Sequence, residues 1–296
     1  LYRKGWFDNH RAGGPETYVE SYYKGPKDNI MYTTNRKEIY VRGEEGAIST
    51  PPRIQMIYNQ ISNSGKTGWD GLFWKSQYKA FTDYFQRKGL APHFGTLDSL
   101  TRVMGNVSFE HQGRRIEGMR MQNLGDAYMV NGWEAMPYDN HSGIVDIYRN
   151  PKGDASILAY YNQPLYVAVA SRNQVVRLPG SAAVDFYIVN EKDLKGNHTL
   201  EIQMIAPDGK VVYTREEKVN LKGGETFGQL LLENVEIPVN AQEGTYRIEA
   251  AIKADNRQIC ARGHDEVVAV GWQASDLSGN GAYYGDGDDK VAAFYK

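Results

Sequence analysis

The chain contains a single cysteine, Cys260, in 296 residues. One cysteine cannot form a disulfide within the chain, and it cannot supply the thiolates of a zinc site. We interpret Cys260, in the stretch RQICARG, as a packed strand residue. The six histidines are scattered without the spacing of metal ligands. The sequence therefore predicts no metal site and no cofactor.

Long apolar runs and an excess of charge of either sign are also absent. No apolar run approaches the ~20 residues that a membrane-spanning helix needs. The formal net charge is -2 and no block of Lys and Arg is present, which argues against nucleic acid as a partner. Hydrophobic residues still make up 41% of the chain, which is enough to build well-packed cores.

The first residues, LYRKGWFDNH, contain neither an initiator methionine nor the apolar stretch of a signal peptide. We therefore expect the chain to begin inside a domain, as a trimmed, processed or incomplete product would.

The first half of the sequence alternates strand-like and helix-like segments. A short strand is predicted over residues 38–43, and an amphipathic helix follows in RIQMIYNQIS, after two prolines that can initiate it. Residues 68–89 carry aromatic side chains at helical spacing, which favours a helix that packs them into a core: Trp74, Tyr78, Phe81, Tyr84 and Phe85. A long helix or helix pair starts near residue 96, and DAYMVNGWEA is predicted to be a buried strand. This order predicts parallel strands joined by crossover helices.

The second half changes period near Tyr166. Short alternating runs are separated by turn signals, and PDGK is typical of a hairpin turn. Roughly six to eight such strands in about 105 residues predict an immunoglobulin-like β-sandwich. We thus expect an α/β part over 1–160 and an all-β part over 161–272. Residues 273–296 are expected to form a linker or the start of a further domain, since DGDD lacks the terminal glutamate of a calcium loop.

Two adjacent carboxylates, Glu44 and Glu45, stand at the end of the first predicted strand, in VRGEEGA. In parallel α/β barrels the functional residues lie at the carboxyl ends of the strands. Neighbouring side chains on a strand point in different directions, so one glutamate can face a pocket while the other meets solvent. A solvated acidic turn is the alternative interpretation of this pair.

Aromatic and polar residues elsewhere in the first half are candidates for binding a sugar. Trp133, next to Glu134, can form the floor under a sugar ring, although a core tryptophan would give the same pattern. Trp6 and His10 can line the same pocket or pack within a loop. Arg42 and either Tyr22 or Tyr23 are candidate partners for the Glu44 carboxylate at this pocket. Farther along, Arg149 and Lys152 in IYRNPKG are interpreted as anchors of the chain rather than as binding residues.

Three stretches resemble glycoside hydrolase family 2, the family of β-galactosidases, β-glucuronidases and β-mannosidases. EIYVRGEEGAISTPPR resembles its seventh barrel strand, in which a glutamate is followed by an often aromatic residue and then by Gly or Ala. Residues 130–152 resemble the eighth strand and the exit from the barrel, and the strands after Pro164 resemble the sandwich that follows. The resemblance runs from about residue 30 to 272. It implies α/β plus all-β architecture: the last strands of a (β/α)8 TIM barrel, then an immunoglobulin-like β-sandwich.

The resemblance also implies a function, that of a retaining exo-β-glycosidase of β-galactosidase type. By position Glu44 is the implied nucleophile, and Glu45 remains the alternative because the family's aromatic residue is missing there. The family's general acid is the glutamate of an Asn-Glu pair at the end of the fourth strand. The Asn-Glu pair of this chain, Asn190–Glu191, falls in the predicted sandwich, so we expect the general acid to be absent from these residues.

The implied partners are a carbohydrate substrate and the missing N-terminal half of the barrel. We expect neither a nucleic acid nor a membrane as a partner. Alone, the chain is expected to hydrolyse little or nothing and to associate with further copies through exposed strand edges. A periplasmic or secreted location is favoured. One alternative is a non-catalytic carbohydrate-binding or split-subunit module. Another is a barrel enzyme that uses Glu44 and Glu45 as metal ligands.

Overall fold

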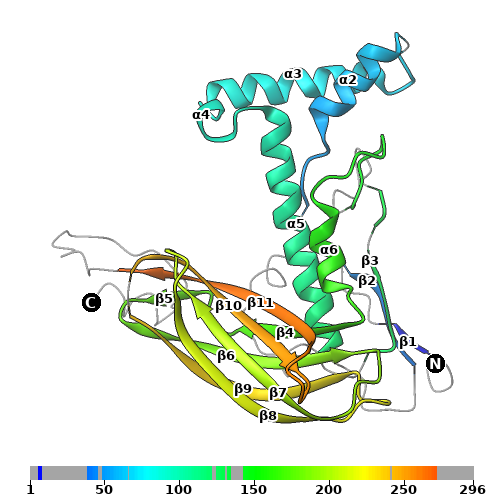
Figure 1. Cartoon of the computed structure of the whole chain (residues 1–296). Helices are drawn as coiled ribbons and strands as arrows, with labels where there is room; N and C mark the ends of the chain where they lie inside the picture. The colour runs from blue at the N-terminus through cyan, green and yellow to red at the C-terminus, as the bar shows by residue number, and fades with distance from the viewer. Residues whose placement is uncertain are drawn as a thin grey trace, which may run out of the picture.

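The computed structural model describes residues 6–8, 39–45, 49–65, 67–121, 125–130, 132–134, 143–240 and 242–271. These residues form a mixed α/β structure in which most elements are strands. Figure 1 shows a small sheet near the N-terminus, a group of helices that extends away from the sheets, and a pair of larger sheets. In the described part of the chain, no helix is both long enough and apolar enough to cross a membrane.

The small sheet contains β1 (Trp6–Asp8), β2 (Ile39–Glu45) and β3 (Ala127–Val130), in that order. Both neighbouring pairs are parallel. Parallel strands need long crossover connections, and helices α2 to α5 all lie between β2 and β3 in the sequence. The predicted arrangement of parallel strands and crossover helices is therefore confirmed for β2 and β3.

The strand predicted in DAYMVNGWEA is present, but the prediction that it is buried is wrong. β3 alternates exposed and half-buried residues, and Met129 is 57% exposed. Within the described residues β3 pairs with β2 alone, so one of its edges has no neighbouring strand there. The alternation of exposed and half-buried residues is typical of a strand with one face toward solvent, whereas a strand covered on both faces would be buried throughout.

Helices α2 (Ile54–Ser64) and α3 (Gly71–Arg87) pack against each other at the far end of α5 from the sheets (Figure 1). Short α4 (Ala91–Phe94) connects α3 to α5. The buried side chains of this cluster are aliphatic and aromatic: Ile54, Ile57, Ile61, Trp74, Phe85 and Leu97. The predicted aromatic core of α3 is therefore confirmed for Trp74 and Phe85.

Tyr84 is the exception among the aromatic residues of α3, because its side chain is exposed. The cationic groups of Arg87 and Lys88 lie 5.6 Å and 5.8 Å from the centre of its ring. Cations over an aromatic face are a favourable surface contact. Helical spacing alone thus assigned Tyr84 to the wrong face.

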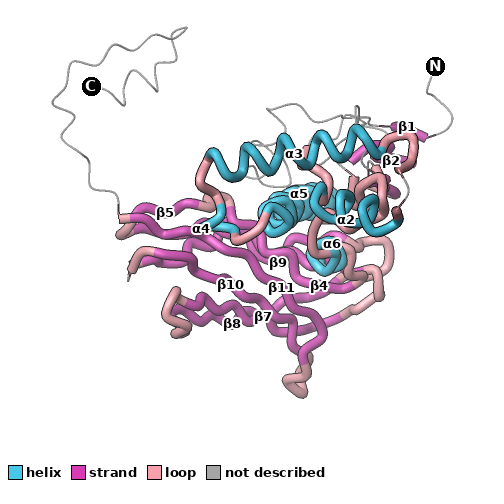
Figure 2. The backbone as a smooth tube through the Cα atoms, turned by 90° about the horizontal axis from the view of Figure 1, so that it is seen from above, coloured by secondary structure: helices cyan, strands magenta, loops and turns pink. Residues whose placement is uncertain are grey.

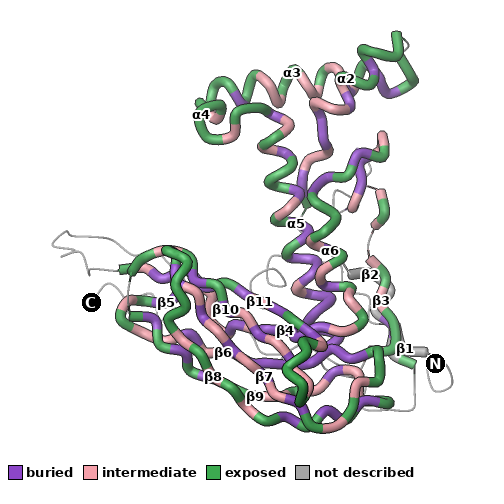
Figure 3. Tube along the Cα trace, in the orientation of Figure 1, coloured by how far each residue is buried: buried purple, intermediate pink, exposed green. Residues whose placement is uncertain are grey.

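Helix α5 (Leu97–Arg120) is one continuous helix and not a helix pair. Thr96 caps its start, since its hydroxyl oxygen accepts a hydrogen bond from the Ser99 amide at 3.0 Å. From residue 111 onward the helix is almost entirely buried, as Figure 3 shows, against α6 (Ala155–Tyr161) and the larger sheets. At Gly113 the ring of Tyr161 lies where a Cβ would be, so this close approach requires glycine.

The two larger sheets pack face to face below the helices (Figure 2). One has the strand order β4 (Leu165–Ser171), β6 (Gly180–Asn190), β9 (Gly228–Val239). The other has the order β5 (Val175–Arg177), β11 (Ile259–Val270), β10 (Gly244–Lys253), β7 (Gly196–Ile205), β8 (Val211–Leu221). Inward-facing side chains of both sheets fill a single core, as in β-sandwiches.

Three smaller predictions for this half are confirmed. Cys260 lies in β11 and is partly buried against the core. The PDGK turn joins β7 to β8, where Gly209 adopts a φ of 83° and Ala206 and Lys210 are hydrogen-bonded through their main chains at 2.8 Å. Asn190 is the last residue of β6, so Asn190–Glu191 does end a strand of the sandwich.

Charged side chains fasten α5 to the sandwich. The Arg114 guanidinium pairs with the carboxylate of Asp265 on β11, whose side chain is fully buried. One turn and a half later, Arg120 pairs with Glu191 at 2.7 Å and donates to the main-chain oxygen of Gln163 at 2.7 Å. Glu117, between the two arginines, is 3% exposed. Burial raises the pKa of Glu117 from its ordinary 4.5 to about 8, against the opposing influence of Arg114.

This shift predicts that the free energy of unfolding falls as the pH rises between about 4.5 and 8. In that window the folded state holds a proton on Glu117 that the unfolded state releases. The stabilisation from protonated Glu117 is complete below pH 4.5 and is lost above about pH 8. Between these values the free energy of unfolding falls by at most about 1.4 kcal/mol per pH unit. Glu117→Gln removes this contribution, so urea titrations at a series of pH values should give a flatter profile. Glu216→Gln, at an exposed site on β8, should keep the original slope; identical profiles for all three proteins would contradict the assignment.

Candidate functional site

The end of β2 carries Glu44 and Glu45, the last two residues of the strand. Its register with β3 pairs Arg42 with Tyr128 and Glu45 with Val130, so three steps along β2 match two along β3. The extra residue is a β-bulge at Gly43–Glu44. Bulges re-aim a strand locally and are frequent next to active sites. The carboxyl edge of the parallel sheet is thus irregular at the position of the predicted carboxylates.

Trp133 and Glu134 follow β3 past the same edge. The segment is held by the Val145 amide, which donates to the Trp133 main-chain oxygen at 3.0 Å, and by a parallel bridge between Glu134 and Val145. The Trp133 side chain is 63% exposed and so is not part of a core. The Glu134 carboxylate pairs with the guanidinium of Arg149. An open aromatic face and a carboxylate with a fixed cation therefore stand together at this edge.

A buried carboxylate organises the loop behind these residues. Asp146 is fully buried and accepts hydrogen bonds from the Tyr148 amide at 2.9 Å and the Asn150 amide at 3.0 Å. The side-chain amide of Asn150 also donates to Asp146 and exchanges two 3.0 Å hydrogen bonds with Gln60 of α2. Burial raises the pKa of Asp146, and these hydrogen bonds oppose the rise. This set of bonds ties the loop to α2.

Lys152 and Arg53 join the same loop to the segment that follows β2. The fully buried Lys152 donates from Nζ to the Thr50 main-chain oxygen at 2.8 Å, and burial lowers its pKa to about 8. Arg53 donates to both carboxylate oxygens of Asp98, at 2.9 Å and 2.5 Å, and to the Pro151 oxygen at 3.0 Å. The prediction that Lys152 anchors the chain is confirmed. For Arg149 the same role stays a prediction: its side chain is 60% exposed and pairs with Glu134 of the preceding segment.

Among the other predicted site residues, the structure describes the main chain of Trp6, which is not at this edge. Trp6 pairs with Ile39 at the start of β2, and the parallel register places it about 16 Å along the strand from Glu44. His10, Tyr22 and Tyr23 lie outside the described residues. Within the described ranges, no group of three His, Cys, Asp or Glu side chains is placed to hold a metal ion. The main chain places Glu45 opposite Val130 on β3, and Trp133 and Glu134 follow that strand in the sequence.

The sequence did not indicate the side chains that support this edge, the buried Arg53 and Asp146 and the partly buried Asp98. Arg53 and Asp98 are 45 residues apart in the sequence, whereas Asp146 is bonded to residues two and four positions later. The local sequence does contain one signal for this loop. In DIYRNPK, charged and apolar residues alternate without the period of a strand or a helix, which is typical of a segment held by hydrogen bonds between side chains and main chain.

No family model and no curated protein matches this chain. Solved structures match it by fold. The β-D-mannosidase of Dictyoglomus thermophilum has a TM-score of 0.50 at 13% identity, over 88% of this chain and 30% of that one. The exo-chitosanase of Amycolatopsis orientalis has a TM-score of 0.45 at 13% identity, over 83% of this chain and 30% of that one. A β-glucuronidase of Bacteroides uniformis has a TM-score of 0.26 at 16% identity, over 36% of this chain and 13% of that one.

The chain therefore spans at most about a third of the length of these glycosidases. The match to the mannosidase shows that the chain has a glycoside hydrolase-like fold. At this identity the likeness concerns the fold alone.

Proposed function

We propose that this chain is part of a retaining exo-β-glycosidase of glycoside hydrolase family 2, with Glu44 as the nucleophile. The observation that carries the proposal is the β-bulge at Gly43–Glu44, at the edge shared with Trp133 and Glu134. The parallel order β1-β2-β3, with helices between the last two strands, supports an assignment to the last strands of a TIM barrel.

In the proposed reaction the Glu44 carboxylate attacks the anomeric carbon of a terminal β-linked sugar. The bond to the leaving oxygen breaks, and that oxygen takes a proton from a general acid. Water, deprotonated by the same acid/base, then attacks the anomeric carbon and releases Glu44. In retaining enzymes the two carboxyl groups stand about 5–5.5 Å apart. Exposed Trp133 would stack against the sugar, and Glu134, oriented by Arg149, would accept hydrogen bonds from its hydroxyl groups.

The general acid is proposed to come from polypeptide outside these 296 residues, in the remainder of the barrel. Glu191 is already engaged with Arg120, and the Asn190 side chain bonds the main chain of Leu194 at 2.8 Å and 3.0 Å. The carbohydrate partner is proposed to be a terminal β-linked sugar of galactoside type, met in the periplasm or outside the cell.

A 2-deoxy-2-fluoro glycoside that traps the glycosyl-enzyme tests this proposal. In the complete enzyme the label should fall on Glu44, located by mass spectrometry of the peptide that carries VRGEEGA. The 296-residue chain alone should take up no label and show no turnover. A label on Glu45 would move the nucleophile by one residue, whereas an active complete enzyme labelled elsewhere would refute the assignment.

A second candidate is a non-catalytic carbohydrate-binding or split-subunit module. One observation favours it: Asn190 is hydrogen-bonded to Leu194 and Glu191 is paired with Arg120. The Asn-Glu pair of the 296-residue chain therefore does not supply the general acid of the family. Glycan binding that survives Glu44→Ala, together with an absence of turnover in the complete gene product, would select this candidate.

A further inference from the structure

Arg149 has a backbone conformation that suits glycine. Its φ is 66°, in the left-handed region that residues with a Cβ rarely adopt. The Arg149 amide donates to the Asp146 oxygen at 2.8 Å, and the Asp146 amide donates to the Asn150 oxygen at 3.0 Å. These bonds close a loop of three residues, whose last position is left-handed and favours glycine. An arginine at this position therefore lowers the stability of the turn.

A second arginine has the same place in an equivalent turn, between β10 and β11. Arg257 has a φ of 61° and donates to the Ala254 oxygen at 2.8 Å, and the Ala254 amide donates to the Gln258 oxygen at 2.9 Å. Within the described ranges the Arg257 guanidinium has no ion-pair partner, whereas the Arg149 guanidinium pairs with Glu134. Backbone strain alone therefore does not distinguish Arg149, but the contact of its side chain does.

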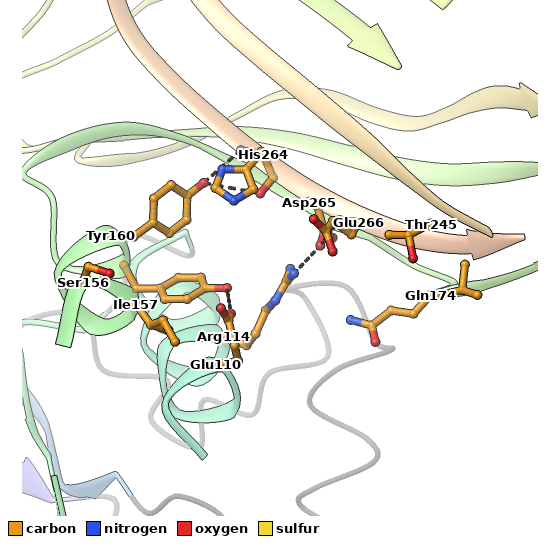
Figure 4. Close-up of a pocket in the computed structure, with 12 residues that line it drawn as sticks. Glu110, Arg114, Ser156, Ile157, Tyr160, Gln174, Thr245, His264, Asp265 and Glu266 are labelled. Atoms are coloured by element: carbon orange, nitrogen blue, oxygen red, sulfur yellow. Dashed lines mark hydrogen bonds and ion pairs between the residues drawn. The ribbon is translucent and has the colours of Figure 1, made fainter. Parts of the chain in front are cut away.

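The Arg149–Glu134 pair is open to solvent, unlike the pair that fastens α5 to the sandwich. Figure 4 shows that second pair, in which the Arg114 guanidinium reaches the fully buried carboxylate of Asp265. The side chains of Arg149 and Glu134 are instead 60% and 24% exposed. An exposed ion pair contributes little to stability. In the part of the chain that the structure describes, the Arg149 guanidinium donates to Glu134 alone, so most of its five N–H donors remain for a ligand.

Both members of the pair stand on main chain that is held in place. Glu134 forms a parallel bridge with Val145, and the Val145 amide donates to the Trp133 oxygen at 3.0 Å. The turn that carries Arg149 is fixed by the buried Asp146 carboxylate, which accepts from two amides of the turn at 2.9 Å and 3.0 Å. Next to Glu134 in the sequence, the Trp133 side chain is 63% exposed. A carboxylate and a guanidinium in a fixed arrangement lose little entropy on binding.

A guanidinium beside a carboxylate matches two neighbouring hydroxyl groups. The carboxylate of Glu134 can only accept hydrogen bonds and the guanidinium of Arg149 can only donate them, whereas a hydroxyl group does both. One hydroxyl group can thus donate to Glu134 while the next one accepts from Arg149. Hydrogen bonds to ionised groups are stronger than those between neutral groups. Sugars carry hydroxyl groups on adjacent ring carbons, so the pair suits a sugar ring.

We infer that Arg149 binds the substrate directly, and that it occupies its strained position for this contact and not to anchor the loop. In the bound sugar, one ring hydroxyl group donates to Glu134 and the adjacent one accepts from Arg149. The inference rests on the proposed glycosidase function and extends it, because it names the feature that the pair recognises: two adjacent, unsubstituted ring hydroxyl groups.

Unfolding of the 296-residue chain separates a binding role from an anchoring one. Arg149→Gly should raise the midpoint of urea unfolding or leave it unchanged, because glycine relieves the left-handed φ and an exposed ion pair adds little. Arg257→Gly is the matched control and should behave in the same way. A midpoint for Arg149→Gly clearly below those of the wild type and of Arg257→Gly would show that Arg149 anchors the loop, and would overturn the inference.

Kinetics of the complete enzyme test the contact itself. With an aryl β-galactoside, or the aryl β-glycoside that the enzyme hydrolyses in its place, Arg149→Gly should raise KM about tenfold and change kcat less than about threefold. Arg257→Gly should have the KM of the wild type. An unchanged KM in Arg149→Gly, in an enzyme labelled on Glu44 by the fluoro glycoside, would overturn this inference alone. No label on any residue of the complete protein would refute the proposed function and this inference with it.

Substrates that each lack one ring hydroxyl group identify the hydroxyl groups that are bound. In the wild type, removal of either of two adjacent hydroxyl groups should raise KM. In Arg149→Gly, removal of one of these two should have no further effect, because its partner is already gone, whereas removal of the other, which donates to Glu134, should still raise KM. Equal factors in the wild type and in Arg149→Gly for every substrate would contradict a contact between Arg149 and the sugar.

Discussion

Glu44→Gln in the complete enzyme should lower kcat on the order of 10³-fold or more, with KM changed far less. The amide keeps the shape of the side chain but cannot attack the anomeric carbon. The change in kcat is measured as the rate of hydrolysis of an aryl β-glycoside, which is monitored through the phenol that the reaction releases. The expected loss exceeds every other effect proposed for this chain.

Chemical rescue distinguishes a missing nucleophile from a damaged site. In Glu44→Ala, added azide can occupy the vacated space and attack the anomeric carbon in place of the carboxylate. The product should be a glycosyl azide with the anomeric configuration opposite to that of the substrate, since a single displacement inverts the centre. A variant that had merely lost its local structure would not form this product.

Glu45→Gln is the matched control, one residue farther along β2. It should reduce kcat less than about tenfold and should not respond to azide. The reverse pattern would assign the nucleophile to Glu45, at the position that pairs with Val130. Mild losses in both variants would contradict a nucleophile at the end of this strand.

Arg114→Met should destabilise the folded chain by about 3–5 kcal/mol, because it leaves a fully buried carboxylate without its cation. Within the described residues, Asp265 would keep the hydrogen bonds from the Ser171 amide at 3.0 Å and the Glu266 amide at 2.7 Å. Two amide donors do not neutralise a buried charge. Urea unfolding followed by circular dichroism at pH 7 measures the change.

Lys79→Met is the control for this second result, since Lys79 and Asp83 form an ion pair of 2.6 Å at an exposed site on α3. Its removal should cost less than about 1 kcal/mol. Arg114→Met combined with Asp265→Asn should recover part of the lost stability, because the uncompensated charge is then gone. Equally small losses at both sites would show that the buried pair does not hold α5 to the sandwich.

The elements that were predictable are those whose signal is local. Helix α2, the aromatic face of α3 and the alternating strands after Tyr166 each follow from a period visible within a dozen residues. Burial of β3 was not predictable in this way, because it depends on which strands and helices cover it. The exposed position of Tyr84 has the same origin.

The same distinction between local and long-range signals applies to the candidate site. Glu44 at the end of a strand follows from a few adjacent residues, but the bulge becomes visible only once β3 supplies the register. Lys152 donates a hydrogen bond to the Thr50 oxygen, 102 residues earlier in the chain, and no periodicity of the sequence indicates that these two residues are in contact. Pairings of this kind are set by the folded topology and not by the local sequence.

Helix α5 has a consequence for how the gene can be dissected. Its 24 residues span about 36 Å, and its second half is covered by α6 and the sandwich. A truncation near residue 161 would separate Arg114 from Asp265 and Arg120 from Glu191. A cut at the predicted boundary near residue 160 is therefore expected to destabilise both halves, since it removes the ion pairs that join α5 to the sandwich.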